Sequence, residues 1–243
     1  MRSQGAVSRL DEVAARARPV ALAREHVLPV LPPFEPLLPE GLRRGSTVAV
    51  DGSTSLALAL AAGPSAAGSW MAAAGVSGLG LTAAAELGVD LGRLVVVGAP
   101  PPQVWATVVA TLVEAFDLVL ARVDRRVRDA DARRLTARAR DAGSVLVLLL
   151  HDGRGAQGAL GIWPDAPDVR LDITASEWSG IGDGHGHLHA RRVEVSATGR
   201  RAAARARHAA LWLPGPNGAV EAADELAPVH VLHRSNVGSK AVL

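Results

Sequence analysis

The sequence of 243 residues contains no cysteine and no tyrosine, and lysine occurs only once, as Lys240. Without cysteine, the chain forms no disulfides, binds no zinc through thiolates and has no thiol nucleophile. The N-terminal residues lack the apolar run of a signal peptide. The long uncharged stretch between Asp51 and Glu86 is interrupted by glycines and Pro64, so it does not resemble a membrane-spanning helix. We therefore expect a cytoplasmic protein with no membrane contact.

The charges nearly cancel, because 26 basic residues oppose 24 acidic ones and leave a net charge of +2. The sequence pI of about 10.2 reflects the abundance of arginine rather than a large excess of positive charge. The overall charge therefore does not indicate nucleic-acid binding, and only local patches could. The hydrophobic share of 49% is large enough to form a substantial core.

Three regions differ in character. Residues 1–37 combine a short predicted helix with a proline-rich linker that we expect to be extended, because proline fixes φ and donates no backbone hydrogen bond. Residues 38–213 alternate between strands and helices and form the predicted core. Residues 214–243 contain proline and glycine with little patterning and are predicted to be a C-terminal tail.

The core pattern predicts an α/β fold with a mostly parallel, twisted sheet and helices on both faces. Strands that are apolar on both faces and separated by helices are typical of such sheets. The predicted strands are 46–51, 70–74, 94–97, 116–121 and 145–150, followed by 169–174 and 188–195. The predicted helices are 55–62, 83–87, 104–115 and 129–142, with Gly88 and Gly143 as C-terminal caps.

The first strand–turn–helix is where a phosphate-binding loop would lie. Such a loop has the pattern G-x-x-x-x-G-K-[ST], whose backbone amides, lysine and hydroxyl bind phosphates and Mg²⁺. Counted from Gly52, the last three positions hold Ala57, Leu58 and Ala59. We expect a turn with the context and length of a phosphate-binding loop but without its chemistry.

Three motifs in order resemble the RecA core. They are LPEGLRRG at 38–45, ELGVD at 86–90 followed by Leu94, and VRLDI at 169–173. The resemblance covers about residues 38–198 and implies a RecA-like, P-loop-type core. At the positions of the catalytic glutamate, the Walker B acid and the nucleotide-sensing glutamine, this chain has 72–75 (AAAG), Arg122, and His151 or Asp152.

The resemblance therefore implies a vestigial nucleotide site with no catalytic residue, no bound cofactor, no metal and no ATPase activity. Asp124 follows two residues after the Walker B position, too far along the strand to replace the acid. The residues of this vestigial site are Gly52, Ser53, Thr54, Ser55, Ala57, Leu58, Ala59 and Arg122.

Residues 177–186 and the GLRRGS segment resemble the actinobacterial ImuA′ family, RecA-like accessory proteins of the damage-induced mutasome. This implies a non-catalytic adaptor in translesion synthesis that binds ImuB and an error-prone DnaE-type polymerase, and associates with the nucleoid on DNA damage. It also implies self-association through the N-terminal helix, unless that helix folds back on its own core. Two alternatives stay open: a RecA-type ATPase with an atypical nucleotide site, and a SulA-like cell-division inhibitor.

Two arginine-rich segments, 122–140 and 191–207, are candidates for DNA or polymerase contact. A solvated helix face in an arginine-rich protein is the alternative interpretation, and a dispersed tryptophan is more often a core residue than a base-stacking one. The candidate contact residues are Arg125, Arg126, Arg133, Arg134, Arg154, Trp163, Arg200 and Arg201.

The tail and one histidine run complete the candidates. His185, His187 and His189 alternate, but glycine at 184 and 186 favours a turn into a strand over a metal site. The apolar residues of the tail are expected to contact ImuB, and they are Val220, Leu226, Val229, Val231 and Leu232.

Overall fold

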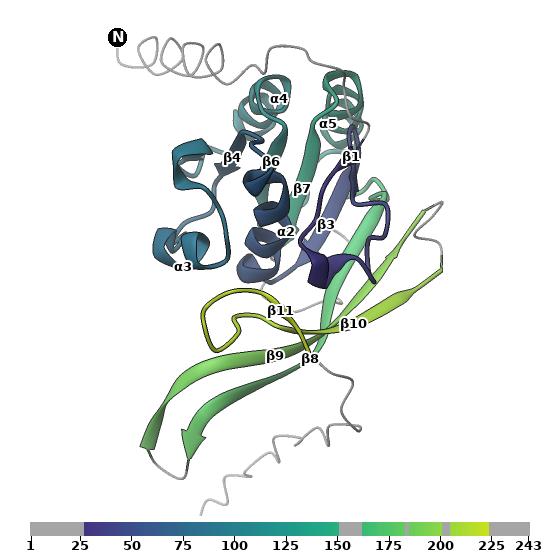
Figure 1. Cartoon of the computed structure of the whole chain (residues 1–243). Helices are drawn as coiled ribbons and strands as arrows, with labels where there is room; N and C mark the ends of the chain where they lie inside the picture. Colours follow the sequence, from purple (N-terminus) through teal and green to yellow (C-terminus); the bar gives the residue numbers. More distant parts are fainter. Residues whose placement is uncertain (1–26, 151–161, 183–184, 201–204, 224–243) are drawn as a thin grey trace, which may run out of the picture.

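A computed structural model of the chain describes residues 27–150, 162–182, 185–200 and 205–223 (Figure 1). Its strands are β1 (Val27–Leu28), β2 (Leu42–Arg43), β3 (Thr47–Asp51), β4 (Met71–Ala74), β5 (Leu94–Val97), β6 (Leu118–Val123), β7 (Val145–Leu150), β8 (Val169–Gly182), β9 (His185–Gly199), β10 (Arg207–Trp212) and β11 (Glu221–Ala222). Its α-helices are α2 (Thr54–Ala66), α3 (Leu81–Glu86), α4 (Trp105–Ala115) and α5 (Asp129–Ala142), with short 3₁₀ helices η1 (Pro32–Phe34) and η2 (Leu91–Arg93).

Nine of these strands form one sheet in the order β11-β10-β9-β8-β3-β7-β6-β4-β5. The neighbours from β8 through β3 to β5 run parallel, whereas β8, β9, β10 and β11 pair antiparallel. This confirms the expectation of an α/β fold with a large, mostly parallel sheet. The first strand of the sheet, β3, lies between its fifth and sixth strands, which differs from the 3-2-1-4-5-6 order of dinucleotide-binding sheets.

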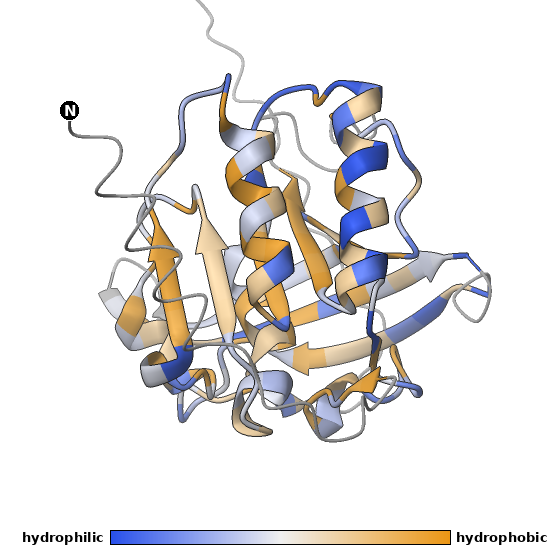
Figure 2. Cartoon of the chain, turned by 90° about the horizontal axis from the view of Figure 1, so that it is seen from above, coloured by the Kyte–Doolittle hydropathy of each residue, from blue (hydrophilic) through white to orange (hydrophobic). Residues whose placement is uncertain are grey.

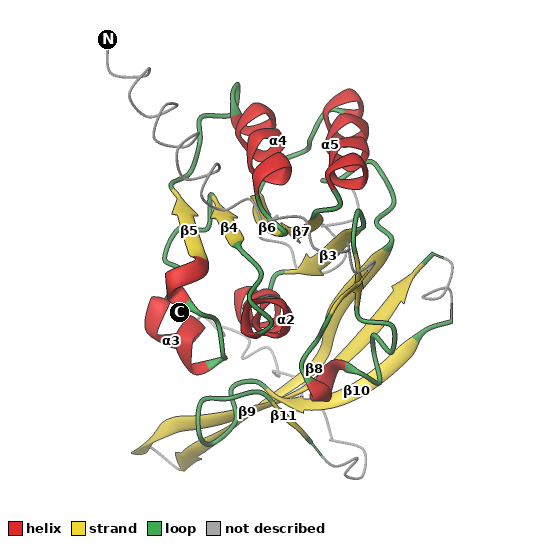
Figure 3. Ribbon diagram, turned by 45° about the horizontal axis from the view of Figure 1, so that its top comes forward, coloured by secondary structure: helices red, strands yellow, loops and turns green. Residues whose placement is uncertain are grey.

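Alternating side chains divide the core into two layers. In β3, Val48 and Val50 pack in the cluster that contains α2, whereas Ala49 packs with α4 and α5. Helices α2 and α3 accordingly lie on one side of the parallel strands, and α4 and α5 on the other (Figures 1 and 3). Seen from the α4–α5 side, the central strands are mostly hydrophobic, and α5 turns hydrophilic residues outward (Figure 2). Helices therefore cover both faces, as predicted.

Helix α5 shows how local sequence fixes an element. Asp129 and Asp131 lie in its first turn and Arg140 in its last, so the charges complement the helix dipole. Gly143 ends the helix in the left-handed region at φ 68°. The buried residues Ala132, Leu135 and Ala139 form its inner stripe. The helix 129–142 and the strands 94–97 and 145–150 were predicted with the observed bounds.

The C-terminal half is more regular than predicted. In place of two short strands, β8 and β9 form a hairpin of 14 and 15 residues. Its proximal part packs Leu171, Ile173, Val193 and Val195 against the core, and its distal part projects away from the sheet (Figure 1). The bulge at Gly180, where φ is 99°, interrupts the alternating pattern that would identify a long strand.

Two predicted segments also differ in structure from what we expected. The proline-rich segment is not an extended linker throughout, because Pro32–Phe34 forms η1, and both Phe34 and Leu37 are fully buried. The segment after residue 213 is not a free tail at its start, because β11 pairs with β10 and Val220 is buried in the core. The predicted N-terminal helix and the rest of the tail lie outside the described residues. Within the described segments, no helix combines the length and apolarity required to cross a bilayer.

Candidate functional site

The turn between β3 and α2 is shorter than a phosphate-binding loop. Only Gly52 and Ser53 separate the two elements. The N–H of Gly52 donates to the carbonyl of Leu150, and φ of 63° suits glycine at this position. The residues between the two glycines of a phosphate-binding loop must leave the helical path to surround phosphates. The predicted length of the turn was therefore wrong, because the helix has already begun at Thr54.

Polar groups of the turn cap the helix themselves. The Oγ of Ser53 accepts a hydrogen bond from the backbone N–H of Leu56 at 3.2 Å, and lies 3.2 Å from the Oγ of Ser55. A side chain of the protein thus occupies the place that an anion takes at an open helix N-terminus. The residues aligned with the phosphate-binding positions, Ala57, Leu58 and Ala59, lie in the buried body of α2.

Arg122, which stands at the position predicted for the Walker B acid, lies within β6 and is half-buried. Its β-carbon is 3.8 Å from the place where a side chain on Gly75 would begin. Its carbonyl accepts a hydrogen bond from the indole N–H of Trp105 at 3.1 Å. Asp124 lies beyond the end of β6, is exposed, and is 3.8 Å from Arg125. The carboxyl end of β6 therefore carries a guanidinium group instead of a metal-binding carboxylate.

A buried cluster of charge lies at the carboxyl end of β3. Arg170 of β8 forms ion pairs with Asp51, the last residue of β3, and with Asp172, the latter at 3.5 Å. The side chains of Asp51, Arg170 and Asp172 are 5%, 16% and 19% exposed. The pairing of β3 with β8 brings these groups together although 119 residues separate Asp51 from Arg170. One guanidinium therefore faces two carboxylates in a poorly solvated place.

This environment raises the pKa of Asp51 from 3.8 to about 7. Burial is the main cause, followed by a hydrogen bond with Asp172 and by its charge, whereas Arg170 acts in the opposite direction. The Oδ1 atoms of both carboxylates are buried and have no donor among the described residues. The carboxyl group of Asp51 therefore keeps its proton to a higher pH than an exposed aspartate does.

Asp51 lies in the predicted strand 46–51 and Asp172 in the motif at 169–173. Neither residue was predicted to belong to a site. The only local signal is a carboxylate within or at the end of a buried strand. Perturbed carboxylates mark functional sites, but structural ion-pair networks produce them as well. Within the described segments, no group of three or more histidine, aspartate or glutamate side chains is arranged to hold a metal ion.

The candidate contact arginines do not form one surface. Arg125, Arg126, Arg133 and Arg134 are exposed on α5 and the loop before it. Arg134 pairs with Asp131 at 3.1 Å, whereas Arg126 and Arg133 form no ion pair with another described residue. The loop that carries Arg125 and Arg126 follows the carboxyl end of β6.

Arg200 lies near the amino ends of the parallel strands. Its N–H donates to the carbonyl of Asp168, which is itself bonded to the backbone of Thr47 at the start of β3. Arg154 and Arg201 lie outside the described residues. Trp163 is 5% exposed and packs in the core layer of α4 and α5, so its ring is not available to stack on a base. Arg125 and Arg126 therefore follow the carboxyl end of β6, whereas Arg200 lies near the amino end of β3.

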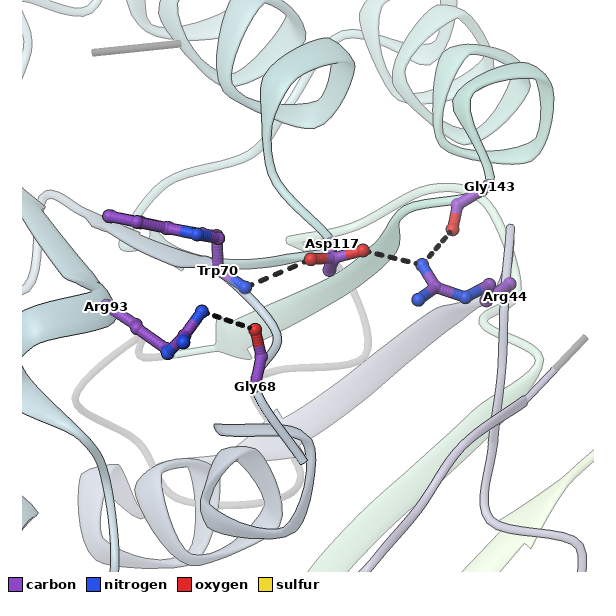
Figure 4. Close-up of polar contacts among 6 residues, drawn as sticks. All are labelled: Arg44, Gly68, Trp70, Arg93, Asp117 and Gly143. Carbon is purple, nitrogen blue, oxygen red and sulfur yellow. Dashed lines mark hydrogen bonds and ion pairs between the residues drawn. The ribbon is translucent and has the colours of Figure 1, made fainter. Parts of the chain in front are cut away.

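Asp117 ties together the amino ends of the parallel strands (Figure 4). Its carboxylate accepts hydrogen bonds from the backbone N–H of Trp70 at 3.0 Å and from Arg44 at 2.8 Å. Arg44 also reaches the carbonyl of Gly143, just before β7. Because these groups precede β3, β4, β6 and β7, Asp117 has a structural role at this edge. Asp117, 8% exposed, has donors for both oxygens.

The fold and these sites define a mixed α/β protein whose first β–α turn is closed by its own side chains. Residues 36–154, which include that turn and five of the parallel strands, match the family described as the MT3502 N-terminal domain. The chain is also 33% identical, over 166 residues, to "Uncharacterized protein Rv3395c" of Mycobacterium tuberculosis. That alignment covers 68% of this chain and 79% of the relative. The chain belongs to the MT3502/Rv3395c family.

Proposed function

We propose that this chain is a non-catalytic adaptor with a RecA-like core, acting in damage-induced mutagenesis by bridging ImuB and an error-prone DnaE-type polymerase. The observation that carries the non-catalytic part is the two-residue turn after β3. Ser53 caps α2 there, and the positions that would hold the phosphate-binding lysine and hydroxyl, Leu58 and Ala59, are buried in the helix. A triphosphate has neither a cradle of free amides nor a counter-charge at this turn.

The RecA-like part is supported by where the matching motifs lie. Residues 38–45 lead into β3, residues 86–90 lead towards β5, and residues 169–173 open β8 beside β3. The three motifs thus fall on the amino side or the start of parallel strands in one sheet. The segment 177–186, which carries the resemblance to ImuA′, lies in the distal part of the β8–β9 hairpin. A surface that projects from the core suits an adaptor that binds protein partners.

The alternative of an active ATPase is less well supported. Catalysis of phosphoryl transfer depends on positioned cations and carboxylates around the phosphates. Here Arg122 replaces the metal-binding acid of β6, and residues 72–75 offer no carboxylate after β4. The cluster of Asp51 and Asp172 faces Arg170 rather than an open site. No observation specifically favours a cell-division inhibitor.

Two measurements test the proposal. Isothermal titration of the full chain with ATP and Mg²⁺ should give no heat of binding. A tagged full-length chain purified from cells with damaged DNA should carry ImuB and the error-prone polymerase, and should carry less of both from undamaged cells. Saturable binding of Mg²⁺–ATP would contradict the non-catalytic assignment. Co-purification of FtsZ in place of ImuB would contradict the mutasome assignment and favour the SulA-like alternative.

A further inference from the structure

A cavity of about 250 Å³ opens at the amino edge of the sheet, away from the turn after β3. The strands β1 and β2, the start of β8 and the segments around residues 200 and 207 surround it. Leu38, Leu42 and Val48 give it an apolar floor, and each of these side chains is at most 5% exposed. The cavity thus offers a preformed apolar surface at the boundary of the core.

Three arginines from separate segments line the same cavity: Arg43 of β2, Arg200 after β9 and Arg207 of β10. Arg43 and Arg207 form no ion pair with another described residue. The guanidinium group of Arg200 forms one ion pair among the described residues, with Asp165 at 3.8 Å. The cavity also includes Glu40 and Asp168, but Oδ2 of Asp168 accepts the backbone N–H of Thr47 at 3.0 Å. Guanidinium groups therefore remain available beside an apolar floor.

We propose that this cavity binds a linear peptide that inserts an aliphatic or aromatic side chain and places carboxylates beside Arg43 and Arg207. Guanidinium groups bind carboxylates through paired, charge-assisted hydrogen bonds. A volume of about 250 Å³ lies below the roughly 300–1,000 Å³ of sites for drug-sized ligands. It suits one or two anchoring side chains of a peptide, as in the buried hot spots of protein interfaces.

The chemistry of the cavity favours an acidic peptide over two other occupants. Among the described residues that line the cavity, none is aromatic, so a nucleic-acid base has no ring there on which to stack. The chain's own residues 1–26 contain five arginines against three acidic residues. Their excess positive charge does not complement the arginines of the cavity. The inference does not depend on the identity of the partners proposed above.

The test is a binding measurement by fluorescence anisotropy on the full chain. The probe is a labelled peptide, GSEELFDEGS, in which two apolar residues lie between acidic ones. Two control peptides remove one feature each: GSQQLFNQGS keeps the shape without charge, and GSEEGGDEGS keeps the charge without the apolar anchor. We expect the first peptide to bind at least tenfold more tightly than either control.

Variants locate the binding. The double substitution R43E and R207E should weaken binding of the acidic peptide at least tenfold, and the conservative R43K and R207K pair should weaken it less. Arg133→Glu, an exposed arginine on α5 without an ion pair among the described residues, is the matched control and should leave binding unchanged. Circular dichroism shows whether each variant is folded.

Several outcomes would overturn the proposal. These are failure of all three peptides to bind, equal binding of the uncharged peptide, and unchanged binding by the folded R43E and R207E variant. If binding appeared only after deletion of residues 1–26, the N-terminal segment of the chain would be the occupant. Tighter binding of a labelled oligothymidylate, lost in the same variant, would assign the cavity to nucleic acid.

Discussion

At the scale of single residues, two buried aspartates show how different partners give a carboxylate different properties. Asp117 receives one hydrogen bond on each oxygen, from the backbone of Trp70 and from Arg44. Asp51 shares Arg170 with a second carboxylate, Asp172, in a site with little access to water. The first arrangement joins strand ends, whereas the second raises the pKa of Asp51.

Asp51 should make the stability of the protein fall as the pH rises towards and through 7. Its pKa of about 7 in the folded chain exceeds the ordinary 3.8, so the folded state holds a proton that the unfolded state has lost. The resulting contribution is present at acidic pH and disappears above pH 7. A rise of about three pKa units corresponds to at most about 4 kcal/mol of unfolding free energy.

Urea denaturation at pH 5 and pH 8 measures this effect. The difference between the unfolding free energies of the wild type and of Asp51→Asn should shift in favour of the variant at pH 8, because asparagine carries no ionising proton. Glu114→Gln is a suitable control, since that carboxylate is half exposed on α4. An identical difference at both pH values would rule out a raised pKa of Asp51 in the folded protein.

The sequence shows which residues stand at the phosphate-binding positions but does not reveal the Asp51 cluster. Ala57, Leu58 and Ala59 are visible in the linear pattern because the phosphate-binding motif is local. Asp51 and Arg170 meet only because β3 and β8 are neighbours in the sheet. No spacing rule connects positions so far apart, and only the pairing of the strands shows that the two aspartates face one arginine.

At the scale of elements, α2 is the helix most constrained by its surroundings. Ten of its residues are buried, and it contains both Gly63 and Pro64. A β-carbon on Gly63 would lie 2.7 Å from the carbonyl oxygen of Pro29 and from two backbone atoms of Val30. The absence of a side chain at this position lets the segment before η1 pack directly on the helix.

Gly63→Ala should therefore destabilise the protein, although alanine favours a helix by about 1 kcal/mol over glycine. The clash involves backbone atoms, which cannot move aside as a flexible side chain can, and overpacking of this kind costs roughly 1–3 kcal/mol. Gly98→Ala, which has open space around it and an ordinary φ, should change stability by no more than about 0.5 kcal/mol. Urea midpoints of the three proteins would decide, and a stabilised Gly63→Ala would contradict the packing.

Element prediction succeeded where local signals were strong and failed where glycine weakened them. Helix 129–142 was found because charge, an apolar stripe and Gly143 agree. The β8–β9 hairpin was predicted too short because Gly180, Gly182, Gly184 and Gly186 resemble a turn in sequence. Cross-strand pairing from Ala175–Glu194 to Gly182–His185 shows that Gly180, Gly182 and Gly186 lie within the paired strands instead.

At the scale of the whole molecule, the chain combines an α/β core with a projecting ribbon, which is the distal part of the β8–β9 hairpin. Trp178 is 45% exposed, and its ring faces Arg191, 5.6 Å from the ring centre. Leu188 is 50% exposed. Ala190 is buried, whereas residues 176–180 and 186–189 of the ribbon are exposed. Stability and partner binding should therefore depend on different parts of the chain.

Shortening the ribbon should separate these two properties. Ser179 and Ala190 are directly paired, so residues 180–189 can be replaced by an Asn-Gly turn that suits a two-residue hairpin. The melting temperature should hardly change, because the described side chains removed are exposed and the bonds from Arg191 to residues 213 and 214 remain. Co-purification of ImuB, the partner that we propose, should be lost, because the change removes most of the segment that resembles ImuA′.

The two readouts distinguish a core element from a binding element. A large fall in melting temperature would mean that the distal ribbon supports the fold, and loss of ImuB would then follow from unfolding. Unchanged melting with ImuB still bound would place the partner surface elsewhere, with the exposed face of α5 as the next site to test. Arg133→Glu on that face serves as the comparison, because it removes an exposed charge that pairs with no other described residue and leaves the ribbon intact. Only stable folding together with loss of ImuB supports the ribbon as the contact that joins this core to the polymerase machinery.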